Sequence, residues 1–146
     1  MHPVVSGFLA GVVAGIIMAA LSDLAYRCRI FKSSLAIIDG HFLFNVIKWK
    51  PSTTLLYTAG IPIHLVTSGI FGAVYTGATD ILGLPTRSPF LVAIYFFLLW
   101  LSMLFIALPT AGQGMLGRKA GRATWFEQLI LHIVFGLAYL QALSIF

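Results

Sequence analysis

The chain has few charged residues and almost no cysteine. Charged side chains make up 9% of its 146 residues and hydrophobic side chains 60%, whereas soluble domains carry about 25% charged residues. Cys28 is the only cysteine, which excludes an internal disulfide, a Cys-x-x-Cys redox pair and a cysteine-rich metal site. The alternating pattern of a membrane-barrel strand is also missing. The sequence therefore predicts an all-α membrane protein.

Four apolar stretches are long enough to cross a membrane as helices, which takes about 20 residues each. We expect these spans at residues 4–26, 53–79, 89–108 and 125–146. Together they predict a single four-helix transmembrane domain over residues 1–146. The acidic residues number only four in the whole chain, so the spans are nearly free of negative charge.

The first connection, residues 27–52, is unusually long for so small a protein. It mixes basic residues with apolar ones, which is typical of segments that lie in the lipid headgroup region. Contact with a partner subunit is the other interpretation of the same surface. Ser33 or Ser34 would cap a short helix here, and Asp39-Gly40 predicts a break in it.

The basic residues indicate the orientation in the membrane. Eight of the nine Lys and Arg residues fall in the first and third connections, and only Arg87 falls in the second. The positive-inside rule then places both termini on the non-cytoplasmic side. The third connection has a glycine spacing like that of a phosphate loop, but it follows a membrane helix instead of a strand. We interpret its Arg118, Lys119 and Arg122 as contacts to anionic lipid headgroups.

Small residues recur every four positions in the first span. They are Gly7, Gly11 and Gly15, and Ala19 extends the row. Small side chains at this spacing form a groove that lets another helix approach closely. The pattern predicts helix packing, and it leaves open whether an internal helix or a second chain fills the groove.

Two spans share a motif that contains a histidine. Residues 61–66 and 129–134 each hold a His between aliphatic residues, and Phe-Gly-x-x-Tyr follows each copy. This predicts a weak two-by-two internal repeat, with His64 and His132 at similar depths in the apolar layer. An ionisable residue inside a membrane is costly to bury and is a functional hypothesis by default.

One hypothesis is a b-type haem held by His64 and His132 as axial ligands. Gly136 would give the macrocycle room, and Tyr75 and Tyr139 share the helix faces of the two histidines. A Zn or Cu site would need three or four ligands, and the spans hold no Cys, Asp or Glu at matching depth.

Two other interpretations of the histidines remain open. One is proton relay through His64, Ser68 and Tyr75. The other is that both are neutral imidazoles which hydrogen-bond across helix contacts, with Gln128 near His132 and Thr67 or Ser68 near His64.

The second half of the chain resembles an uncharacterised group of small bacterial four-helix membrane proteins. The resemblance lies in Pro109-x-x-Gly112-x-Gly114-x-x-Gly117, followed by His132 and by Phe135-Gly136. His64 with its following glycines and the glycine-rich first span are similar too. The resemblance implies the four-helix architecture and a bacterial inner (cytoplasmic) membrane, and it implies no activity.

Catalysis is not expected, because no Ser or Cys nucleophile has an evident His partner with an orienting carboxylate. Our leading functional hypothesis is a non-catalytic accessory subunit of a larger membrane complex. It rests on the glycine groove, the bulky third span and the small aqueous connections. A haem-binding electron-transfer protein is the alternative, and a small transporter or channel is the third. The expected partners are membrane lipids and other membrane subunits, without nucleic acid.

Overall fold

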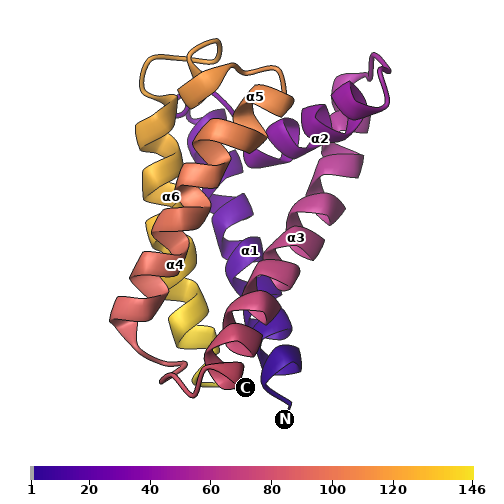
Figure 1. Ribbon diagram of the computed structural model, residues 1–146. Helices are drawn as coiled ribbons and strands as arrows, with labels where there is room; N and C mark the ends of the chain where they lie inside the picture. The colour runs from indigo at the N-terminus through magenta and orange to yellow at the C-terminus, as the bar shows by residue number, and fades with distance from the viewer. Residues whose placement is uncertain (1) are drawn as a thin grey trace.

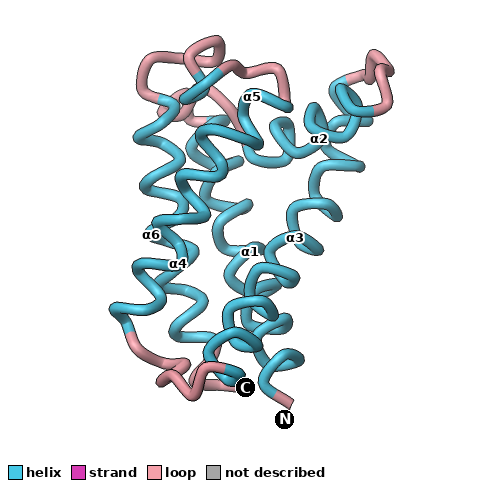
Figure 2. Tube along the Cα trace, viewed as in Figure 1, coloured by secondary structure: helices cyan, strands magenta, loops and turns pink. Residues whose placement is uncertain are grey.

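The computed structural model describes residues 2–146, and these residues contain helices and no strand (Figures 1 and 2). The prediction of an all-α chain is therefore confirmed. The elements are α1 (Pro3–Arg27), α2 (Leu35–Val46), α3 (Thr53–Ile81), α4 (Pro89–Ser102), the π-helical η1 (Met103–Ala107), α5 (Leu108–Thr110), the short η2 (Met115–Gly117) and α6 (Thr124–Ala142).

Within these residues, three helices are long and apolar enough to cross a membrane. They are Pro3–Arg27, Thr53–Ile81 and the continuous Pro89–Thr110. The fourth predicted span corresponds to α6, which has 19 residues and carries Glu127, Gln128 and His132 within its apolar sequence.

The long helices form a bundle that α2 crosses at one end (Figure 1). α1 packs against α3 and α6, α4 packs against α6, and α2 packs against α3. Both termini lie at the opposite end from α2, and the two basic connections lie at the end where α2 crosses (Figures 1 and 2). α3 and α4 meet near the terminal end, where the Tyr95 hydroxyl donates to the Phe71 carbonyl at 2.9 Å.

The glycine groove on α1 receives α3. A Cβ atom on Gly7 would lie 2.5 Å from the Gly72 carbonyl oxygen, and one on Gly15 would lie 2.7 Å from Ser68 Oγ. A Cβ atom on Gly11 would collide with the Ser68 carbonyl oxygen. Ala19, one turn further along, is half-buried. An internal helix therefore occupies the groove.

The predicted break at Asp39-Gly40 is wrong, because α2 runs through it without interruption. Gly40 and Gly60 instead form the contact between α2 and α3. A Cβ atom on Gly40 would collide with the Leu56 carbonyl, and one on Gly60 would collide with the Ala36 carbonyl. The glycine that suggested a turn is needed for close packing.

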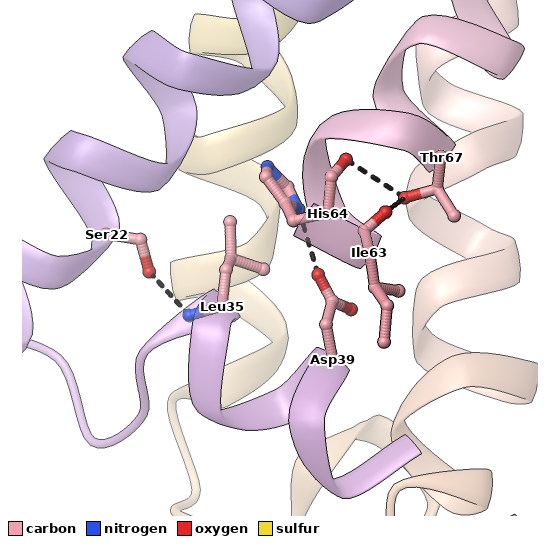
Figure 3. A network of polar contacts seen from close by, with 6 residues as sticks. All are labelled: Ser22, Leu35, Asp39, Ile63, His64 and Thr67. Atoms are coloured by element: carbon pink, nitrogen blue, oxygen red, sulfur yellow. Dashed lines mark hydrogen bonds and ion pairs between the residues drawn. The ribbon is translucent and has the colours of Figure 1, made fainter. Parts of the chain in front are cut away.

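The N-terminus of α2 is capped by another residue than the expected Ser33 or Ser34. Ser34 occupies the N-cap position, but its hydroxyl makes no capping hydrogen bond. Ser22 of α1 does this instead, since its hydroxyl accepts from the Leu35 amide at 3.0 Å (Figure 3). The first amides of a helix have no partner within it, and here a side chain of α1 provides one for the Leu35 amide.

The contact between α2 and α3 predicts an asymmetry between two glycines of α3. Gly60→Ala should lower the free energy of unfolding in detergent by about 1–3 kcal/mol, because the added methyl group forces two backbones apart. Gly77→Ala is the matched control, since its Cβ atom would lie 3.4 Å from Val4 Cγ2, an ordinary contact. Its stability should stay the same or rise, because Ala is the better helix former. Equal stability of the two variants would contradict this packing.

Candidate functional site

The buried polar site begins with His64 of α3 and Asp39 of α2. The Nδ1 atom of His64 lies 2.9 Å from Oδ2 of Asp39 (Figure 3). The side chains are 9% and 19% exposed, respectively. Gly60 lies one turn before His64 and Gly40 follows Asp39, so the close helix contact brings the carboxylate to the imidazole. The sequence did not predict this pairing.

The carboxylate sets the orientation of the imidazole. An ionised carboxylate can only accept, so it pairs with a proton on Nδ1. A neutral imidazole held in this way keeps Nε2 as an acceptor. Nε2 is buried and has no hydrogen-bond partner among residues 2–146. In Figure 3 one edge of the ring faces Asp39, and Nε2 lies on the side away from it. The site therefore presents one unpaired nitrogen in a fixed position.

A cavity of about 270 Å³ is lined in part by His64. Its wall is mostly aliphatic and aromatic, and its polar lining residues come from α2, α3, α4 and α6. These polar residues are Asp39, His64, Thr67, Ser68, Ser102 and His132. Both histidines therefore line the same cavity. Apolar pockets with a few convergent polar groups are the usual form of a small-molecule site.

A π-helical segment forms one wall of the cavity. Met103, Ile106 and Ala107 of η1 line it, and the Leu108 amide donates to the Met103 carbonyl, five residues back. Pro109 follows directly and has no amide proton to continue an α-helical ladder. The widened turn is therefore explained by the proline. Single π-helical turns occur frequently at functional sites.

His132 is held within its own helix. Its Nδ1 atom lies 2.8 Å from the Gln128 carbonyl oxygen, so Gln128 is its partner, through the backbone and within one helix instead of across a helix contact. His132 also lines a second cavity of about 260 Å³, which is apolar, lies between α4 and α6, and includes Gly136. His132 is the residue that the two cavities have in common.

The two tyrosines predicted beside the histidines lie elsewhere. The Tyr139 hydroxyl donates to the Gly72 carbonyl at 2.7 Å, and the Tyr75 hydroxyl donates to the Thr86 carbonyl at 3.0 Å. Their ring centroids are 5.8 Å apart, in the cluster that joins the helices near the terminal end. The expectation that Tyr75 and Tyr139 belong to the site, and the relay through Tyr75, are therefore corrected.

Gly136 has a packing role beside His132. A Cβ atom at Gly136 would lie 3.1 Å from Cδ2 of Phe96. Its small size thus lets the Phe96 ring of α4 approach α6. This contact lies on the second cavity.

The described residues place no group of three potential metal ligands around the histidines. Across residues 2–146, no three His, Cys, Asp or Glu side chains are placed so that they could hold a metal ion together. The hydrogen bonds at both Nδ1 atoms do resemble those of metal-bound histidines, which usually donate their second N–H to a carboxylate or carbonyl.

Haem is a poor match for the space between the histidines. Cavities that enclose drug-sized ligands measure about 300–1,000 Å³, and haem is larger than most such ligands. The cavity of about 270 Å³ falls below this range. Both histidines line this cavity, and haem ligation by His64 and His132 stays a prediction.

A buried carboxylate on α6 was also missed. Glu127 of α6 is 5% exposed and accepts from the Lys32 amide at 3.1 and 3.3 Å. It ties the segment before α2 to the first turn of α6. Its placement on an apolar helix was the signal that could have identified it.

The basic residues of the third connection are accessible. Arg118, Lys119 and Arg122 are exposed. Gly112, Gly114 and Gly117 have φ values of 79°, 71° and 69°, a conformation that favours glycine. The glycine spacing thus serves a tight turn.

Comparison of the chain with protein-family models, curated proteins and solved structures gave no match. Function is therefore inferred from the cavity and the residues around it.

The pairing of Asp39 with His64 can be measured by a double-mutant cycle with Asp39→Ala, His64→Ala and the double variant. We expect a coupling free energy of about 1–3 kcal/mol from unfolding in detergent, because the hydrogen bond is shielded from water. The pair Asp23 and Arg27 is the matched control, since the Arg27 side chain is 71% exposed and solvent screens it. Equal coupling in the two pairs would contradict a buried interaction.

Proposed function

We propose that this protein is an integral membrane protein that binds a lipid-soluble ligand inside its helix bundle. The observation that carries the proposal is His64, which lines a cavity and whose buried Nε2 atom has no hydrogen-bond partner among residues 2–146. Leaving a buried polar group unpaired costs about 1–3 kcal/mol. A ligand that pairs with this nitrogen would recover that cost and bind by doing so.

The outer surface supports a position in the membrane. Large apolar side chains are exposed on all the long helices, including Ile16 of α1, Val66 of α3, Phe97 of α4 and Leu137 of α6. Soluble monomers seldom expose continuous apolar surface of this extent. The lipid hydrocarbon would cover it.

We further propose that α6 completes a set of four spans, in a bacterial cytoplasmic membrane. Its 19 residues give a length of about 28 Å as a helix, close to the hydrocarbon thickness of about 30 Å. The two connections that hold eight of the nine basic residues lie at the end opposite the termini (Figure 1). This end would face the cytoplasm, where Arg118, Lys119 and Arg122 would meet anionic headgroups.

The ligand would enter from the hydrocarbon, between α3 and α4. The cavity is lined by both helices, and some of its lining residues are also exposed at the molecular surface. Phe71 of α3 is 40% exposed and Ile106 of η1 is 63% exposed. A molecule dissolved in the membrane could thus reach His64 without crossing a polar layer.

The accessory-subunit hypothesis has less support than this one. It relied on a groove on α1 that another chain could fill, and α3 occupies that groove. The remaining bulky face of α4 is equally suited to lipid.

The native Cys28 tests the orientation. It is exposed, and it follows α1 directly at the basic end of the bundle. A membrane-impermeant maleimide should label it only after the cells are opened. Asp80→Cys in a Cys28→Ser background is the control, because exposed residue 80 lies at the terminal end of α3 and should be labelled in intact cells. The opposite labelling pattern would overturn the topology.

Co-purification tests the ligand site. Wild type and His64→Leu would be purified in mild detergent, and their extracted lipids compared by mass spectrometry. We expect a lipid-soluble compound near one per protein chain in the wild type, reduced about tenfold in His64→Leu through the lost hydrogen bond.

His41→Leu is the matched control, since His41 lies on α2 and lines neither cavity. It should retain the compound. Identical extracts from wild type and His64→Leu would contradict the proposed function.

A further inference from the structure

We propose that the ligand of this cavity is an uncharged lipid-soluble molecule with one aromatic ring and a free hydroxyl group, a phenol or a quinol. This inference rests on the proposed function, because it names the chemistry of the molecule that the same site would bind. It follows from the size, the polarity and the entrance of the cavity.

The volume of the cavity fits a ligand with a single aromatic ring. A cavity of about 150 Å³ lined by aliphatic and aromatic side chains is large enough to bind benzene. The cavity beside His64 measures about 270 Å³, which leaves room for one substituted ring and too little for a porphyrin. The aromatic side chains of Phe42, Phe71 and Phe135 line it, and aromatic rings pair favourably edge to face.

The hydrogen bonding of His64 favours a ligand that carries a hydroxyl group. With Nδ1 bonded to Asp39, Nε2 needs a partner that donates a proton. A hydroxyl group supplies that proton and can also accept a hydrogen bond. An ether or a ketone can only accept, and neither pairs with an unprotonated Nε2. Among neutral head groups, a hydroxyl is therefore the most favourable match.

Charge excludes the common acidic lipids. A carboxylate or phosphate placed at Nε2 would lie close to the Asp39 carboxylate, in an apolar cavity where like charges repel more strongly than in water. A charged amine would have to lose its hydration to enter through hydrocarbon. The head group is accordingly neutral.

The entrance leaves space for a tail. Phe71 and Ile106 line the cavity and are also exposed to the surroundings of the bundle. An alkyl or prenyl chain on the ring would pass between α3 and η1 into the hydrocarbon. The ring would thus be bound by protein while its tail stays in lipid.

A matched pair of probes tests this inference. A fluorinated 4-alkylphenol and the 4-alkylanisole with the same chain differ only by methylation of the oxygen. Their binding to wild type in lipid nanodiscs would be measured by fluorine NMR against empty nanodiscs. We expect the phenol to bind about fivefold more tightly, the effect of one buried hydrogen bond. His64→Leu should abolish the preference, and His41→Leu should keep it.

Each outcome is decisive. Equal affinity of the two probes for wild type would overturn the hydroxyl class and leave the proposed ligand-binding function standing, because the ring still binds. If neither probe bound above the background of empty nanodiscs, the single-ring inference would be overturned. The proposed function is tested separately, and it would be contradicted if His64→Leu gave the same lipid extract as wild type. A preference that persists in His64→Leu would place the hydroxyl away from His64 and overturn the inference. The wild-type comparison does not depend on how any variant folds.

Discussion

The close contact between α2 and α3 at Gly40 and Gly60 determines where the polar site lies. Neither glycine has a side chain, so the carbonyl groups of Ala36 and Leu56 can occupy the space that a Cβ atom would need. Only at this separation does Asp39 reach His64 at 2.9 Å. The Ser22 hydroxyl fixes the start of α2 against α1 at the same time. Three helices are therefore joined around one imidazole.

The cavity results from the way the helices are joined at the other end. Tyr95 bonds to Phe71, and Tyr139 bonds to Gly72, so α4 and α6 are tied to α3 on the side of the termini. At the end where α2 crosses, α3 follows α2 while α4 stays with α6 (Figure 1). The space between these two groups of helices contains His64. The tyrosines thus act at a distance from the site, by closing the end of the bundle opposite it.

Hydropathy predicted the helices closely, because long apolar stretches leave little choice in a chain with so few charges. The observed helices at Thr53–Ile81 and Pro89–Thr110 begin where the sequence indicated. The role of Asp39 was missed because Asp-Gly is typical of a turn, and its partner lies 25 residues further along the chain. Tyr75 and Tyr139 were misplaced because a shared helix face says nothing about distance along the helix.

The presence of a largely buried imidazole–carboxylate pair calls for a reason beyond stability. Replacing a buried ionic or polar pair with well-packed apolar residues is often neutral or stabilising, by about 1–4 kcal/mol. The surroundings of His64 are suited to such a replacement, since Leu35 and Ile63 are its neighbours (Figure 3). A purely structural contact between α2 and α3 would need only Gly40 and Gly60. The buried Nε2 atom of His64 also has no hydrogen-bond partner among residues 2–146, which is a further cost to the folded state. A role in binding accounts for both costs, because the ligand would use the unpaired atom that the fold alone does not need.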